Sequence, residues 1–229
     1  MVDNSKCWLK DNCSHIDCDK FCMRHYKLDY LYNQALISDV QRKHITFKIE
    51  NGAIGEEDLE AFKSLQKIEN NILDFVANGD SLYIHSKICG NGKTSWALRL
   101  VQTYFNKIWP YCNLECKALY INVPRFLLAL KDNITTKSDY VEHIKENVLD
   151  CDLVVWDEIG TKGLTQFEHE NILSLINARI DLGKANIYTS NLTDEELHTA
   201  IGDRLYSRIV NLSDTYVFNG ADRRGTIVW

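Results

Sequence analysis

The fold of this chain is constrained most by a short apolar run that leads through a glycine-rich turn into a helix-forming stretch. The run covers residues 82–85, the turn reads Ser-Lys-Ile-Cys-Gly-Asn-Gly-Lys-Thr over residues 86–94, and the helix-forming stretch continues to residue 100. Glycines in such a turn let backbone N–H groups approach phosphate oxygens, and the N-terminus of the next helix adds partial positive charge. The pattern predicts a strand, a phosphate-binding loop and a helix, in that order.

Six consecutive residues of this loop are expected to bind ATP. Lys93 would reach the β- and γ-phosphates, and the Thr94 hydroxyl would hold Mg²⁺. The first glycine of the usual pattern is replaced by Lys87, while the rest of the loop is intact. A chance occurrence of Gly-Lys-Thr is the alternative. The expected binding residues are Gly90, Asn91, Gly92, Lys93, Thr94 and Ser95.

Two acidic residues follow a second apolar run. Residues 153–156 read Leu-Val-Val-Trp, which is typical of a strand covered on both faces, and Asp157 and Glu158 come directly after them. Carboxylates at the carboxyl end of a central parallel strand face the ligand crevice. We expect Asp157 to hold Mg²⁺ and Glu158 to polarise the attacking water as a general base. An acidic pair on the surface is the alternative.

Two further motifs complete an ordered set. Asn191 follows the apolar run of residues 185–190, where it could orient the attacking water; a turn or helix cap is the alternative. Arg204 and Arg208 are spaced to share one helix face. One of them could reach the nucleotide of a neighbouring subunit as an arginine finger, and a solvated basic helix end is the alternative.

Apolar runs alternate with helical patterns along most of the chain, which predicts an α/β fold with a five-stranded parallel sheet. The strands are expected at residues 81–86, 117–123, 152–157, 185–190 and 215–219. The intervening helices are expected to begin near Lys93, Arg125, Gln166 and Asp194. We assign residues 51–229 to this ATPase domain.

The first part of the chain, residues 1–50, is expected to form a separate module. Half of the chain's eight cysteines lie here, with the spacing Cys-x5-Cys-x4-Cys-x3-Cys. Four thiolates can form a closed tetrahedral Zn²⁺ site, and a segment this short needs a metal to fold. The expected ligands are Cys7, Cys13, Cys18 and Cys22, with His15 or His25 as substitutes.

Three alternatives compete with zinc in this module. An iron–sulfur cluster also uses four thiolates, and the cysteines could be unligated. Disulfides are disfavoured, because a P-loop ATPase without a signal peptide belongs in a reducing cytoplasm.

Two helical stretches follow the cysteines, from Tyr26 to about Ile45 and from Glu56 to about Ala77. Cys112 and Cys116 are expected to be packing residues.

The net charge of −6 argues against a protein that coats nucleic acid by itself. It allows a local basic site of weak affinity for single-stranded DNA. Residues 123–131 are the candidate, because Arg125 offers charge and Phe126 an aromatic face. An amphipathic helix with a buried Phe126 is the alternative. No run reaches the roughly 18 apolar residues of a membrane helix.

The four motifs, in this order and spacing, resemble those of the AAA+ ATPases. From about residue 60 onward, the chain resembles the DnaC/DnaI-type helicase loaders, phage-encoded versions included, and their relatives, the IstB-type transposition ATPases. After Arg208 the chain has room for one strand and a tail but no helical lid, as in these loaders. The residues that carry the resemblance are 90–95, 155–160, 188–192, Arg204, Ser207 and Arg208.

The resemblance implies a cytoplasmic ATPase, in a bacterial or phage-infected cell, that loads a DnaB-type hexameric helicase onto single-stranded DNA. It implies Asn191 as sensor 1, favours Arg208 as the arginine finger and implies self-association through the ATP sites. It places a helicase-binding region at the N-terminus and a sensor 2 candidate at Arg223 or Arg224. The alternatives are an IstB-type transposition helper and an ATP-switched adaptor or inhibitor of the helicase.

Overall fold

The structure is a computed structural model that describes residues 7–9, 13, 22–44, 56–161 and 163–222. Five parallel strands form one sheet in the order β2-β3-β4-β1-β5, so that β1 lies between β4 and β5. This confirms the predicted parallel α/β fold. The strands are β1 (Ser81–His85), β2 (Ala118–Asn122), β3 (Leu153–Asp157), β4 (Ala185–Ser190) and β5 (Asp214–Val217).

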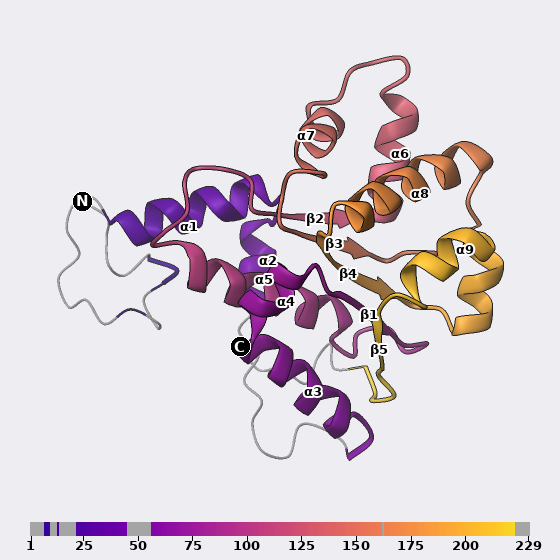
Figure 1. Cartoon of the computed structure of the whole chain (residues 1–229), viewed down its shortest axis with the longest axis horizontal. Coiled ribbons are helices and arrows are strands. Elements are labelled where there is room, and N and C mark those ends of the chain that lie inside the picture. The colour runs from indigo at the N-terminus through magenta and orange to yellow at the C-terminus, as the bar shows by residue number, and fades with distance from the viewer. Residues whose placement is uncertain (1–6, 10–12, 14–21, 45–55, 162, 223–229) are drawn as a thin grey trace.

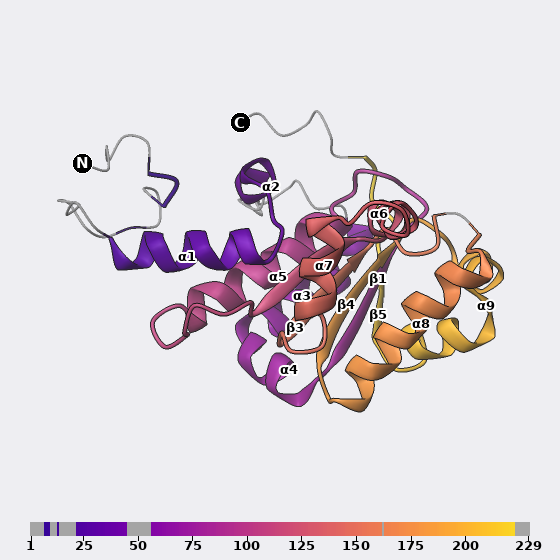
Figure 2. The same ribbon diagram turned by 90° about the horizontal axis from the view of Figure 1, so that it is seen from above.

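Helices cover both faces of the sheet, as Figures 1 and 2 show. One core cluster joins one face of the sheet to α1 (Met23–Gln34), α3 (Leu59–Asn70), α4 (Ile72–Asn78) and α5 (Lys93–Ile108). A second cluster joins the other face to α6 (Val123–Asp132), α7 (Asp139–Asn147), α8 (Gln166–Asp181) and α9 (Asp194–Ile209). Helix α2 (Asp39–His44) follows α1, and the 3₁₀ turn η3 (Glu56–Asp58) precedes α3.

Alternation along the strands separates the two clusters. On β3, Val155 belongs to the first cluster, whereas Val154 and Trp156 belong to the second. All five residues of β3 are buried, as expected for a parallel strand with helices on both faces. Asp157 is the last residue of β3 and therefore lies, buried, at the carboxyl edge of the sheet.

The two helical stretches predicted near the N-terminus are each interrupted. The stretch from Tyr26 contains α1 and α2, because Leu36 between them has a left-handed φ of 62° that no helix tolerates. The stretch from Glu56 is divided into η3, α3 and α4, with Asn71 outside helical geometry. Helix α7 was not expected from the sequence, whereas α6 begins at Val123, close to the expected start near Arg125.

Helix α1 packs on the same core as the sheet. Leu28, Leu31 and Tyr32 are buried in the first cluster, and Tyr120 of β2 donates its backbone N–H to the carbonyl of Ala35 at 2.8 Å. Both views place α1 on the opposite side of the molecule from α9 (Figures 1 and 2). In the expected N-terminal module, residues 22–37 therefore share their core with the ATPase domain.

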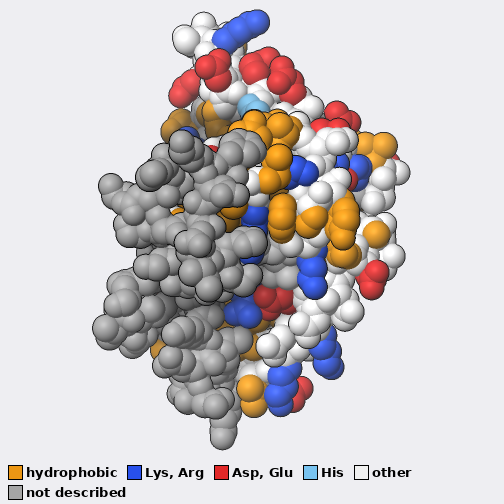
Figure 3. Space-filling model, turned by 90° about the vertical axis from the view of Figure 1, so that its left-hand side faces the viewer, with side chains coloured by type: hydrophobic (Ala, Val, Ile, Leu, Met, Phe, Trp, Pro, Cys, Tyr) orange, Lys and Arg blue, Asp and Glu red, His pale blue; other side chains and the backbone are white. Residues whose placement is uncertain are grey.

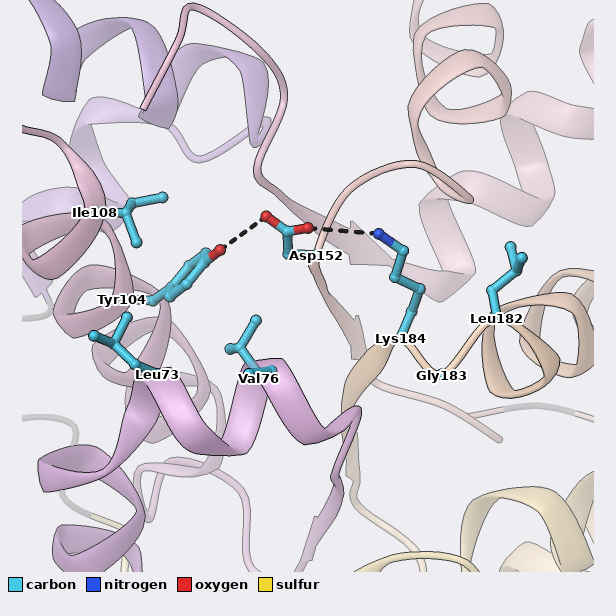
Figure 4. A pocket seen from close by; sticks show the side chains of 9 residues that line it. Leu73, Val76, Tyr104, Ile108, Asp152, Leu182, Gly183 and Lys184 are labelled. Atoms are coloured by element: carbon cyan, nitrogen blue, oxygen red, sulfur yellow. Dashed lines mark hydrogen bonds and ion pairs between the residues drawn. The ribbon is translucent and has the colours of Figure 1, made fainter. Parts of the chain in front are cut away.

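A hollow of about 500 Å³ lies at the amino ends of β3 and β4, opposite the carboxyl edge. Tyr104 donates to Asp152 at 2.9 Å across this hollow, and Lys184 lies 3.5 Å from the same carboxylate (Figure 4). Leu73 and Val76 form its apolar wall.

The described residues after β5, up to Asp222, contain no further helix. Among the described residues, no helix is long and apolar enough to cross a membrane.

Two glycines with left-handed backbones differ in the space around them. Gly79 ends α4 with φ 71°, and a Cβ there would overlap the backbone carbonyl of Gly183. Gly183 itself has φ 63°, but a Cβ there would meet open space. We expect Gly183→Ala to lower the free energy of unfolding by about 1 kcal/mol through backbone strain alone. We expect about 3 kcal/mol or more for Gly79→Ala, because the clash adds to the strain.

Urea unfolding of both variants checks this difference. Gly163→Ala is the matched control, because Gly163 has no left-handed φ and no atom near its potential Cβ. Equal losses for Gly79→Ala and Gly183→Ala would contradict the close approach of the two turns.

Candidate nucleotide-binding and active site

The predicted loop lies between β1 and α5, at the carboxyl edge of the sheet. Gly90 has φ 79° and Gly92 has φ 104°, conformations that residues with a side chain rarely adopt. Helix α5 begins at Lys93 with Gly92 as its N-cap. The sequence prediction of strand, loop and helix is therefore confirmed, and the helix N-terminus points its free N–H groups toward the loop.

Side chains inside the loop bond to the loop itself. Asn91 is fully buried and donates to the Ser86 hydroxyl at 2.6 Å. The Lys93 ammonium donates to the Ile88 carbonyl at 2.9 Å and to the Asn91 side-chain oxygen at 3.2 Å. These bonds hold the ammonium within the loop, where phosphate oxygens would be stronger, charged acceptors for it.

The carboxylate of Asp157 joins four elements of the site. Its Oδ1 accepts from the Thr94 hydroxyl at 2.8 Å and from the Thr189 hydroxyl at 2.7 Å. Its Oδ2 accepts from the Tyr120 hydroxyl at 2.6 Å. The two residues predicted to hold Mg²⁺ are thus in contact, and their oxygen atoms are the hard ligands that this ion prefers. The donor set fits a magnesium ion.

Glu158 turns the chain sharply at the end of β3. Its φ is 60°, a left-handed value that costs energy for a non-glycine residue and is often found at functional sites. Its backbone N–H donates to the Thr189 hydroxyl at 3.0 Å, and its carboxylate accepts from the Asn122 amide at 3.0 Å. The turn therefore directs the side chain toward the end of β2, half-buried beside Asp157.

Four polar residues of this site were missed by sequence reasoning. Tyr120 and Asn122 come from β2, Thr189 from β4 and Ser86 from the end of β1. Asn122 and Ser86 follow the rule that identified Asp157, because both are polar residues at the carboxyl end of an expected strand. Tyr120 and Thr189 lie within strands, where sequence alone does not distinguish a site residue from a core residue.

The predicted sensor residue lies at the carboxyl end of β4, whereas the predicted finger residues lie on α9. Asn191 follows β4 and is partly exposed. Arg204 and Arg208 are exposed on α9, after a kink at Gly202, and Arg208 donates to the Asn177 side chain of α8 at 2.8 Å. The single chain thus leaves both arginines on its surface, and their roles stay predictions. Arg223 and Arg224 lie outside the described residues.

The predicted DNA-contact segment needs one correction. Phe126 is 1% exposed in the second core cluster, so it cannot stack on a base; the alternative of a buried Phe126 is correct. Arg125 is exposed, with its guanidinium 4.6 Å from the centre of the Tyr140 ring. The amphipathic pattern of α6 puts Phe126 inside and Arg125 outside.

The predicted zinc site gains no support from the described residues. Among them, no group of three or more His, Cys, Asp or Glu side chains could hold a metal ion. The Cys22 thiol accepts the His25 backbone N–H at 3.4 Å, as the N-cap of α1. Cys18 and His15 lie outside the described residues. Cys112 is buried and Cys116 half-buried, and burial raises the pKa of Cys116 to about 12.

His85, the last residue of β1, makes stability depend on pH. Burial lowers its pKa, with an opposing effect from Asp194, and its ring stacks on Tyr83 at 4.9 Å. The unfolded chain therefore binds a proton at a pH where folded His85 does not. We therefore expect the free energy of unfolding to fall as the pH drops below about 6.5. In His85→Phe, urea unfolding between about pH 7 and pH 5 should show a weaker loss.

His198→Gln is the control for this measurement, because His198 is exposed on α9 and solvent screens its ion pair with the exposed Asp203. It should keep the pH dependence of the unsubstituted chain. A loss as steep in His85→Phe as in the unsubstituted chain would show that His85 is not responsible.

Comparison with known proteins agrees with this geometry. Solved structures with the same fold include the DnaC helicase loader, 18% identical, with a TM-score of 0.60 over 72% of this chain and 92% of that chain. A putative primosome component from Streptococcus pyogenes serotype M3 is 17% identical, with a TM-score of 0.63 over 85% and 98%. DnaI is 15% identical, with a TM-score of 0.58 over 80% and 93%. These likenesses show the fold.

No curated protein matches the chain by sequence. The profile of the family described as IstB-like ATP binding protein matches residues 61–212, which include the phosphate-binding loop, Asp157, Glu158 and Asn191. This match and the geometry of the phosphate-binding loop together make the protein a P-loop ATPase, and the chain belongs to the family of IstB-like ATP-binding proteins.

Proposed function

We propose that this ATPase loads a DnaB-type hexameric helicase onto single-stranded DNA during replication. The observation that carries the proposal is the arrangement around Asp157, whose carboxylate accepts hydrogen bonds from residues of α5, β2 and β4. The DnaC helicase loader and DnaI have a similar fold. The arrangement supports ATP turnover, and the fold supports the replication setting.

Each residue of the site has a proposed task in hydrolysis. The N–H groups of the loop and the Lys93 ammonium bind the β- and γ-phosphates. Thr94 and Asp157 hold magnesium, which neutralises charge on the phosphates. Glu158 accepts a proton from the attacking water, and Asn191 orients that water. Arg208 of a neighbouring protomer, or Arg204, completes the site, so that ATP joins protomers.

The surface around the N-terminal end of α1 supports a protein partner. Hydrophobic side chains are exposed on the side of the molecule that carries the N-terminal end of α1 (Figure 3). Met23 and Tyr26 of α1 are 50% and 46% exposed, and Tyr111 in the loop before β2 is 89% exposed. Exposed apolar groups of this size often mark protein interfaces. We propose that the helicase binds here and that Arg125 contacts DNA weakly.

The family match favours a second candidate, an IstB-type helper of transposition. Such a protein would assemble on duplex DNA and would need many cationic contacts with phosphates. The net charge of −6 counts against that mode of binding. The two candidates therefore differ in the nucleic acid and in the protein that each requires.

The test uses the Glu158→Gln variant, which should bind ATP but hydrolyse it slowly. We expect this variant, mixed with a DnaB-type hexamer and ATP, to give a complex of defined mass in light scattering after gel filtration. The unsubstituted chain should transfer the ring onto circular single-stranded DNA. Hydrolysis is needed for release, so Glu158→Gln should form the complex but transfer the ring at least about tenfold more slowly.

Lys93→Ala is the control, because it removes the cation that binds the phosphates and should abolish any ATP dependence of the complex. The outcome that excludes helicase loading is the absence of a helicase complex combined with ATP-dependent assembly on duplex DNA. That result would establish the transposition candidate instead.

A further inference from the structure

Tyr120 contacts both the N-terminal helices and the metal-binding carboxylate. It lies on β2, an edge strand of the sheet, and is 8% exposed. Its backbone N–H donates to the carbonyl of Ala35 at 2.8 Å, just beyond α1. Its hydroxyl donates to Oδ2 of Asp157 at 2.6 Å. One residue therefore links the docking of α1 to the site.

The end of α1 is held firmly against β2. Ala35 is fully buried, and the left-handed Leu36 turns the chain so that Ile37 is also buried. Farther back on α1, Lys27 donates to the Cys112 carbonyl and Tyr30 to the Leu114 carbonyl, each at 3.0 Å, in the loop that leads into β2. A shift of α1 would therefore move the strand segment that carries Tyr120.

The two oxygens of Asp157 differ in what orients them. Oδ1 faces the hydroxyls of Thr94 and Thr189, which belong to the nucleotide site itself. Oδ2 is held by Tyr120, the residue of the site whose backbone also bonds to the chain just beyond α1. A short hydrogen bond to a charged acceptor fixes the rotation of the carboxylate, so Tyr120 determines how Oδ1 faces Thr94.

We propose that Tyr120 is a positioning residue that orients Asp157 for magnesium and makes this orientation depend on the docking of α1 against β2. The inference rests on the proposed role of Asp157 at the metal. A partner that binds α1 would thereby change how tightly the site holds magnesium with ATP, without contacting the nucleotide.

The first test measures how much Mg²⁺ increases the affinity for a fluorescent ATP analogue. Tyr120→Phe removes only the hydroxyl, so we expect this increase to fall about tenfold while affinity without Mg²⁺ stays the same. Tyr104→Phe is the matched control, because Tyr104 is also buried and donates to an aspartate, Asp152, at the opposite edge of the sheet. It should leave the increase unchanged.

Asp157→Asn separates the inference from the proposed function. If this variant keeps the full effect of Mg²⁺, the proposed role of Asp157 fails. If Asp157→Asn loses the effect but Tyr120→Phe keeps it, Tyr120 is not a positioning residue and the inference is overturned. A loss in Tyr104→Phe as large as in Tyr120→Phe would also overturn it, since the effect would then be general destabilisation.

The second test addresses the coupling to α1. Leu31→Ala should loosen the docking of α1, because Leu31 is 1% exposed in the shared core. We expect Leu31→Ala alone to reduce the effect of Mg²⁺ on ATP-analogue affinity. Added to Tyr120→Phe, it should cause no further reduction. If circular dichroism shows that Leu31→Ala does not fold, Lys27→Ala takes its place. Reductions that multiply in the double variant would overturn the coupling.

Discussion

The hydrogen bonds to the carboxylate of Asp157 are the interaction on which the rest of the site depends. They bring together the first turn of α5, the middle of β2 and the end of β4, which are far apart in sequence. The carboxylate is 2% exposed, and a buried charge is tolerated only when several donors surround it. The same donors that make its burial possible also fix its direction.

The order of the strands in the sheet makes these hydrogen bonds possible. Strands β3, β4 and β1 are neighbours, so Asp157, Thr189 and the phosphate-binding loop end at one edge. The parallel register of β1 and β4 places Ile84 beside Thr189 and His85 beside Ser190. The two strands therefore end at the same level of the sheet. The buried Arg179 supports the opposite edge by donating to the carbonyls of Cys151 and Ala185.

The sequence predicted the parallel fold and the strand, loop and helix around Gly92 because those features are local. Continuous apolar runs and left-handed glycines such as Gly92 leave a pattern within a few residues of each other. The supporting residues were not predictable in this way. Tyr120 is identified by its distance from Asp157, which depends on the register of β2 against β3, and register is a property of the folded sheet.

The N-terminal region shows the other limit of sequence reasoning. A pattern of apolar residues predicts helices there but does not show what they pack against. Leu28, Leu31 and Tyr32 of α1 pack in one core cluster with the sheet, a contact that the cysteine composition of residues 1–50 did not indicate. Leu36 ended the first helix through backbone geometry that its residue type does not favour.

The most direct test of the account is to measure ATP binding and ATP hydrolysis in parallel for the unsubstituted chain and Glu158→Gln. We expect magnesium-dependent hydrolysis by the unsubstituted chain, and we expect Glu158→Gln to retain ATP binding while its turnover falls about a hundredfold or more. Equal turnover in the two proteins would contradict the assignment of Glu158 and of the site built around Asp157.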